Sequence, residues 1–253
     1  MSVALFLETI LKQTRTMFIK QIMKIYFTVF FTLVSIYAKA QREHHVDLTY
    51  GIGQNTSSIS ANVVKNFKLL KSEKLHIGVG GRAGFTFASN SQSFTTAPAK
   101  HTKNKAGIDT IIVNKAHFIT ANLTLNASYH FTKSWAIGAN VDLAGLTLGK
   151  KKKADFYPSA LSQSEGPKTK VFMDSTTVKT MRTNFYFTGN RNKGTLYSEL
   201  FIRYTPTERY SIKLGYNFII SEYATTSRVG YKDNYRFRNT YGQFLIGIGY
   251  NFI

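Results

Sequence analysis

Apolar residues alternate with polar or small residues along most of the chain after residue 40. The last segment is the clearest example, because Phe244, Ile246 and Ile248 share one face while Gln243 and Gly247 share the other. Segments of about 9–11 residues with a period of two are typical of tilted membrane-spanning strands. The same period recurs near residues 45–53, 58–67, 75–87, 120–131, 135–144, 195–205 and 211–220. We see no convincing helical period in this region, and the pattern predicts an all-β fold.

The connections between these segments alternate between short and long. Residues 68–73, 132–134 and 206–208 are short turns, a brief connection falls near 54–57, and long connections cover 89–116, 149–193 and 223–240. Transmembrane barrels have tight turns at one end and long loops at the other. The spacing therefore predicts an eight-stranded antiparallel up-and-down β-barrel with both termini at the short-turn end. Ten strands is the alternative.

The side on which the apolar residues face separates a membrane barrel from a soluble one. In a soluble barrel the apolar face points inward and the polar face meets water. Here the polar face consists mainly of Gly, Asn, Thr and Ser, and aromatic residues on the opposite face gather beside the short turns and the C-terminal strand end. Such a cluster is typical of the interfacial girdle of an outer-membrane barrel. The aromatic residues are Tyr129, Phe131, Trp135, Tyr204, Tyr210, Tyr250 and Phe252.

The N-terminal segment has the pattern of an export signal. The apolar run 25–37 follows Lys20 and Lys24 and precedes Ala38-Lys39-Ala40. A charged region, a short apolar region and a small-x-small site are typical of a cleavable signal peptide, and the run is too short to span a membrane. We therefore expect residues 1–40 to be a signal peptide and residues 41–253 to form the barrel. Met17 or Met23 is an alternative start of translation, and the residues before it would then not belong to the protein. The expected location is the outer membrane of a Gram-negative bacterium.

The composition excludes some classes of protein. The chain contains no cysteine, which excludes a disulfide framework, a thiolate metal site and a lipid anchor on cysteine. The formal net charge is +20, and a charge of this size would normally indicate a nucleic-acid partner. Most of the bases fall in the three long connections, however, and the expected location argues against nucleic acid.

Six charged residues fall on the face that we expect to point into the barrel. Buried charges are retained only when they are paired, and equal numbers of acids and bases favour a paired network within the barrel. A narrow, gated path for ions is the alternative, since packed polar interiors can still conduct. The six residues are Asp47, Arg82, Asp142, Glu199, Arg203 and Lys213.

Ser128 and His130 share one face, two residues apart, and are the candidates for nucleophile and base. The topology places both of them inward beside a short turn, away from lipid acyl chains. We therefore predict no enzyme activity, no catalytic residue, no cofactor and no metal site. A barrel-embedded lipid-modifying enzyme is the least favoured alternative.

The ending GQFLIGIGYNFI resembles the C-terminal strand of outer-membrane barrels, except that Ile253 follows the usual final Phe. Residues 41–253 are similar to the small outer-membrane β-barrel proteins of the Bacteroidetes type, with an OmpX/OmpA-barrel-like architecture. The resemblance implies that Tyr250 and Phe252 form the signal read by the barrel-assembly machinery.

The basic long connections supply the functional hypothesis. Clustered Lys and Arg suit phosphate groups, and lipopolysaccharide presents phosphates at the outer surface. We expect a monomeric barrel with a structural or surface-interaction role, which contacts lipopolysaccharide or another polyanion and the surrounding outer-membrane lipid. A narrow pore is the alternative. The predicted anion contacts are Lys150, Lys151, Lys152, Lys153, Arg236 and Arg238.

Overall fold

Strands dominate the computed structural model, which describes residues 42–69, 73–97, 105–165, 175–187 and 192–252. The predicted signal peptide, residues 1–40, and Ile253 lie outside the described residues. Within the described part no helix is long and apolar enough to cross a membrane. The described strands join in one antiparallel sheet of 13. The prediction of an all-β antiparallel fold is confirmed.

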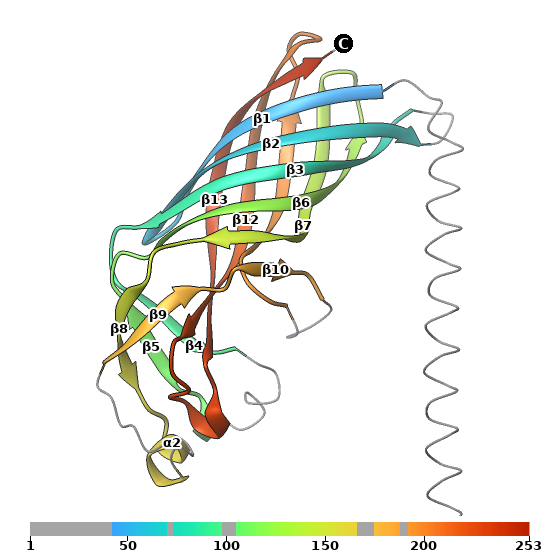
Figure 1. Ribbon diagram of the computed structural model, residues 1–253. Coiled ribbons are helices and arrows are strands. Elements are labelled where there is room, and N and C mark those ends of the chain that lie inside the picture. The colour runs from blue at the N-terminus through green and yellow to red at the C-terminus, as the bar shows by residue number, and fades with distance from the viewer. Residues whose placement is uncertain (1–41, 70–72, 98–104, 166–174, 188–191, 253) are drawn as a thin grey trace, which may run out of the picture. The chain divides into compact units, whose positions relative to one another are not determined.

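The long strands close a ring of hydrogen bonds, which we call the main ring (Figure 1). The order around it is β1-β2-β3-β6-β7-β11-β12-β13, and β13 pairs back onto β1. The predicted short turns recur between β2 and β3, β6 and β7, and β11 and β12. The members of the main ring are β1 (Arg42–Ile52), β2 (Thr56–Leu69), β3 (Leu75–Ala88), β6 (His117–His130), β7 (Trp135–Leu148), β11 (Leu196–Tyr204), β12 (Tyr210–Thr225) and β13 (Arg236–Phe252).

The connections that we expected to be long loops contain further strands. β12 and β13 continue past the main ring and pair with β9 and β4, which closes a second ring in the order β12-β9-β8-β5-β4-β13. We call it the distal ring, because it lies at the end of the main ring opposite the short turns (Figure 1). Its short strands are β4 (Gln92–Thr96), β5 (Thr110–Val113), β8 (Lys152–Tyr157) and β9 (Ser175–Thr180), and β10 (Thr183–Phe185) pairs with β7.

The tip of the distal ring carries three short helical segments. They are α2 (Ala160–Glu165), η1 (Lys105–Gly107) and η3 (Tyr231–Asp233), one from each long connection. Both carboxylate oxygens of Asp109, which is fully buried, hold this tip together. Oδ1 accepts hydrogen bonds from Ser159 N at 2.8 Å and Ser162 Oγ at 2.5 Å, and Oδ2 accepts one from Tyr231 N at 2.8 Å. One acidic side chain therefore joins all three connections.

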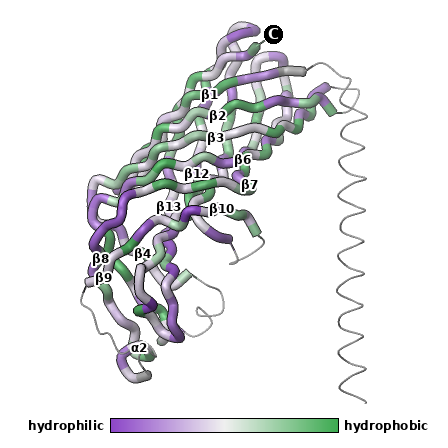
Figure 2. Tube along the Cα trace, viewed as in Figure 1, coloured by the Kyte–Doolittle hydropathy of each residue, from purple (hydrophilic) through white to green (hydrophobic). Residues whose placement is uncertain are grey.

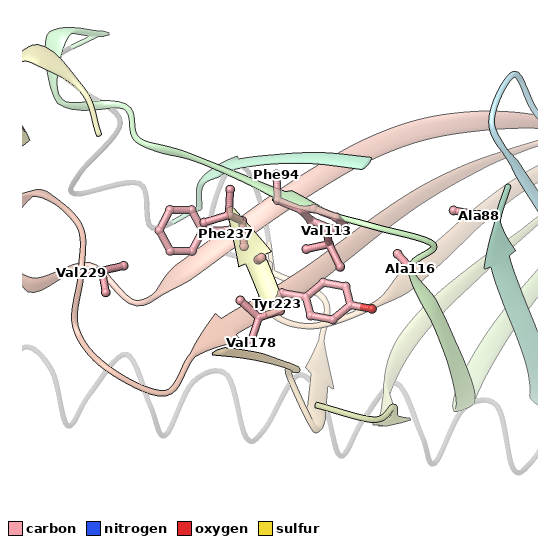
Figure 3. Close-up of a cluster of buried hydrophobic side chains, with 10 residues drawn as sticks. Ala88, Phe94, Val113, Ala116, Val178, Tyr223, Val229 and Phe237 are labelled. Carbon is pink, nitrogen blue, oxygen red and sulfur yellow. The ribbon is translucent and has the colours of Figure 1, made fainter. Parts of the chain in front are cut away.

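The distal ring has an apolar core (Figure 3). Phe94 and Tyr223 pack edge to face with ring centroids 5.0 Å apart, and Phe156 and Phe237 do so at 6.3 Å. Alternate residues of a strand point to the same side, so Ile111 and Val113 of β5 both face inward. Burial raises the pKa of Tyr223 to about 12, so its hydroxyl stays neutral. The fully or nearly buried members are Ala88, Phe94, Ile111, Val113, Ala116, Ala154, Val178, Tyr223, Val229 and Phe237.

The main ring has the opposite polarity. Apolar side chains point outward along its strands, so that Phe244 is 73% and Ile248 65% exposed. Gln243, which precedes Phe244 on β13, is fully buried. Figure 2 shows the resulting alternation of hydrophobic and hydrophilic residues along these strands. A soluble barrel would bury the apolar set and expose the polar one. The apolar outer wall is therefore suited to lipid.

Aromatic residues form two belts on this wall. At the short-turn end, ring centroids lie 4.6 Å apart for Trp135 and Tyr204 and 5.5 Å apart for Tyr210 and Tyr250. This belt corresponds to the one predicted from the sequence. Nearer the distal ring, Tyr216 packs against Phe218 and Phe244, at 4.8 and 5.2 Å, Phe85 stacks on Phe87, and Phe185 lies 6.2 Å from Phe187. We did not predict the second belt, because some of its residues fall outside the strand segments that we recognised.

A bulge in β7 changes the predicted direction of its distal half. The register against β6 passes from Thr124↔Asp142 to Leu123↔Ala144, which leaves Leu143 as an extra residue. Ala144 therefore faces outward with Leu123, although strict alternation from Asp142 along residues 135–144 would place it inward. A bulge inserts one residue and reverses the alternation that follows it. As a result Leu146 and Leu148 lie on the outer wall, 55% and 61% exposed.

Candidate functional site

The structure brings together all six charges that we assigned to the interior. They form one chain of ion pairs in which acid and base alternate, from Asp142 through Arg82, Glu199, Lys213 and Asp47 to Arg203. The successive N···O distances along this chain are 3.6, 2.9, 2.7, 3.1 and 2.7 Å. All six side chains are buried. Three acids balance three bases, so these six side chains together have no formal net charge.

His45 extends this chain at the short-turn end. Its Nε2 lies 3.1 Å from Arg203 Nη2 and 3.4 Å from Asp47 Oδ2, and its Nδ1 lies 3.2 Å from Asn66 Nδ2. We did not select His45 from the sequence. Its inward position follows from the alternation along β1, because His45 and Asp47 are two residues apart.

Neutral polar groups support the other end of the chain. Asp142 accepts hydrogen bonds from Asn122 Nδ2 at 2.6 Å, Thr124 Oγ1 at 3.0 Å and the backbone N of Tyr197 at 3.2 Å. The Oδ1 of Asn122 in turn accepts a bond from Asn184 Nδ2 at 2.7 Å. A buried carboxylate is tolerated when hydrogen bonds replace water around it. Asn184 belongs to β10, so this network joins the main ring to the connection that precedes β11.

Phe201 is the large apolar side chain among these charges. Arg203 and Lys213 lie over its ring at 5.1 and 5.2 Å, which are cation–π distances. Gly138 and Gly215 on the neighbouring strands leave the space for it, since a Cβ at Gly138 would meet Phe201 Cζ at 2.5 Å. The interior at this level is therefore filled by packed side chains.

Ser128 and His130 do not form a recognisable catalytic pair in the described residues. The side chain of Ser128 is buried, and its Oγ has no hydrogen-bond partner in the described part of the chain. The ring of His130 packs on that of His76, with centroids 4.1 Å apart. The contact joins β3 and β6 beside two short turns, away from the distal ring.

The exposed charge at the two ends of the molecule differs strongly. The described parts of the long connections 89–116, 149–193 and 223–240 lie at the distal end, and we call these the distal connections. Among their acids with a described side chain, Asp155 is exposed and the others are half-buried or buried. The short-turn end exposes Lys74, Lys133 and Arg209 against Glu73 and Glu208. Exposed bases of the distal connections are Lys105, Lys115, Lys150, Lys151, Lys153, Lys179, Arg182, Arg228 and Lys232.

The predicted anion contacts separate into two groups. Lys150, Lys151 and Lys153 are exposed. Lys152 is half-buried, and its Nζ donates to the backbone oxygens of Asn114, at 3.3 Å, and Lys115. Burial and, second, the charge of Lys115 lower the pKa of Lys152. This lysine therefore supports the β5–β6 turn as well as adding charge.

Arg236 and Arg238 instead surround a buried carboxylate. The Nη2 atoms of Arg236 and Arg238 lie 2.8 and 2.7 Å from the oxygens of Glu222, and the backbone N of Gly194 donates to the same group at 3.0 Å. Both arginines also donate to the backbone oxygen of Asn192. The guanidinium groups of both arginines therefore attach the segment before β11 to β12 and β13. Two positive charges face one negative charge at this place.

A shallow polar groove adjoins Arg238, where β13 exchanges one neighbour for another. β13 pairs with β4 at Phe237 and Arg238 and with β1 from Phe244 to Phe252. The groove has a volume of about 530 Å³. It is lined by Ser93, Thr95, Thr96, Ala97, Arg238, Asn239 and Thr240.

Comparisons with solved structures found outer-membrane proteins. Ail of Yersinia pestis in a phospholipid nanodisc is 12% identical, with a TM-score of 0.38, over 84% of this chain and 100% of that chain. A major outer-membrane protein of Thermus thermophilus is 12% identical, with a TM-score of 0.40 and the same coverage. Neisserial surface protein A is 11% identical, with a TM-score of 0.33, over 83% and 96%. No protein-family model and no curated protein matched the chain.

Proposed function

We propose that this chain is an outer-membrane β-barrel that holds a basic, structured extension at the cell surface, where the extension contacts a polyanion. In this proposal the eight strands of the main ring span the membrane and the distal ring lies outside it. The apolar outer wall and its two aromatic belts support the membrane position, because interfacial aromatics flank the hydrocarbon in such barrels. The closed main ring supports it as well, because lipid-exposed backbone must be fully hydrogen-bonded. The resemblance of residues 41–253 to outer-membrane barrels of the Bacteroidetes type stays a prediction.

One observation carries the functional part of the proposal. In the described residues the three long connections expose nine bases, and Asp155 is their exposed acid. Lys153 and Lys179 lie on β8 and β9, two strands that surround the apolar core, and the other seven bases lie in the segments between strands. A surface of this kind favours anionic partners such as lipopolysaccharide, through attraction that weakens as salt rises.

The test is a binding measurement with purified, folded protein. We expect lipopolysaccharide micelles to bind at low ionic strength and to be released progressively between about 0.01 and 1 M salt, because the Debye length falls from about 30 to 3 Å. Neutral detergent micelles are the control. Binding that is equal with neutral micelles, or that does not respond to salt, would contradict the proposal.

A narrow pore is less well supported than surface binding. The alternating ion pairs and Phe201 occupy the interior at one level, and the apolar core of the distal ring lies on the continuing inward faces of β12 and β13. Ions cross apolar constrictions poorly, because such segments lose water.

A further inference from the structure

Three segments from different connections converge where the main ring meets the distal ring. They are residues 114–117, 149–153 and 179–182. A Cβ at Gly149 would lie 2.6 Å from Thr180 Cγ2 and 3.4 Å from the backbone oxygen of His117. Lys152 ties its own segment to Asn114 and Lys115 through its ammonium group. The three segments are therefore neighbours in space.

These segments contribute seven bases and no acid. We call the seven the basic collar. The next acid along β8 is Asp155, which pairs in register with Ile112 and Ser175, farther along the distal ring. Like charges gathered without a carboxylate repel one another until an anion neutralises them. The basic collar consists of Lys115, Lys150, Lys151, Lys152, Lys153, Lys179 and Arg182.

The basic collar begins where the lipid-suited wall ends. Ile119 and Leu148 are paired in register and are 53% and 61% exposed, and they are the last such pair between β6 and β7. Lys150 follows Leu148, the last residue of β7, by two residues, and two extended residues span at most about 7 Å. The collar therefore starts within about 7 Å of the end of the apolar wall. Headgroups occupy about 5–7 Å on each side of a 30 Å hydrocarbon core.

We infer that the basic collar binds the phosphate groups of lipid A in the surrounding outer leaflet. The inference rests on the proposed function and narrows it, because it names a lipid beside the protein as the ligand and the junction of the two rings as its site. Lys150, Lys151 and Lys153 are exposed and supply charge, whereas Lys152 holds the β5–β6 turn in place. A soluble polyanion is the competing occupant.

The tip of the distal ring offers a matched control. Lys105, Arg228 and Lys232 are also exposed, but they come from η1, η3 and the residues before η3. Lys232 and Arg228 lie over the rings of Tyr231 and Tyr235 at 5.0 and 6.0 Å. Replacing these three bases with Gln removes the same charge as replacing three bases of the collar.

The experiment compares the variant Lys150→Gln/Lys151→Gln/Lys153→Gln with the variant Lys105→Gln/Arg228→Gln/Lys232→Gln and the unchanged chain. Each is tested for affinity toward diphosphoryl lipid A, monophosphoryl lipid A and inorganic polyphosphate, after retention of the folded barrel is verified by heat-modified gel migration. We expect the collar variant to lose about 100-fold in affinity for diphosphoryl lipid A, since three charges near an anionic surface contribute about two factors of ten. The tip variant should lose less than threefold.

The outcomes separate the inference from the proposed function. A larger loss of lipid A affinity in the tip variant than in the collar variant would overturn the collar but keep the polyanion proposal. Equal affinity of the unchanged chain for diphosphoryl and monophosphoryl lipid A would also overturn phosphate recognition by the collar. Failure of the unchanged chain to bind all three probes would remove the proposed function as well.

Discussion

At the scale of single residues, the interior is governed by the requirement that buried charges be paired. Lys213 contacts both Glu199, at 2.7 Å, and Asp47, at 3.1 Å, and so links two halves of the chain of ion pairs. Removing one partner of a buried pair leaves an uncompensated charge that water cannot reach. The interior should therefore be much more sensitive to substitution than the outer wall.

Glu199→Leu tests this sensitivity. It removes a partner from both Arg82 and Lys213, and we expect the free energy of unfolding to fall by about 3–5 kcal/mol. Ser198→Leu is the control, because Ser198 pairs with Val141 and Phe218 on the outward parity and should change stability little. Urea unfolding in lipid vesicles can be followed by the fluorescence of Trp135, the chain's one tryptophan. Opposite results for the two variants would mean that the assigned directions along β11 are exchanged.

The sequence predicted which charges point inward but not which of them are partners. Alternation along a strand determines the side of a residue, and that was enough to select all six. The structure pairs Glu199 with Arg82 of β3 and Lys213 of β12. Partners depend on the stagger between neighbouring strands, and no pattern within one strand records that stagger.

At the scale of elements, the main difference from expectation is the distal ring. Its four additional strands are 4–6 residues long, and each alternates buried with more exposed positions. In the sequence such short runs are separated by polar and basic stretches, so we interpreted them as loop. β9 pairs with β12 and β4 pairs with β13, while β5 and β8 complete the ring between them, so the short strands depend on two long strands that extend from the main ring.

Asp109 should control the order of the tip without controlling the main ring. Asp109→Ala removes acceptors for Ser159 N, Ser162 Oγ and Tyr231 N, and losing a buried acceptor costs about 1–3 kcal/mol for each group left unpaired. We expect limited proteolysis to cleave the distal connections at least tenfold faster in this variant.

The control for this experiment is Asp155→Ala, which changes an exposed acid of the same region. It should leave the rate of cleavage unchanged. In both variants the heat-modified migration of the folded barrel should persist, because the main-ring pairings do not involve Asp109. Loss of the folded band with Asp109→Ala would show that the two rings are not separable in stability.

At the scale of the whole molecule, the proposal requires one orientation in the membrane, with the distal ring outside. The absence of cysteine allows single-cysteine variants without a background thiol. Gln163→Cys lies on α2 at the tip, and Lys133→Cys lies in the β6–β7 turn, both at exposed positions. We expect a membrane-impermeant maleimide to label the first on intact cells and the second only after the outer membrane is permeabilised. Labelling of Lys133→Cys on intact cells would reverse the orientation.

The sharing of β12 and β13 by both rings has a consequence for the order of assembly. Among the described strands β13 comes last in the chain, and it is the partner of β1 in the main ring and of β4 in the distal ring. Neither ring can close without β13, so the wall and the surface extension must close together. Without β13, the strands β1, β4 and β12 would each lose a partner, and unpaired strand edges invite pairing with other chains.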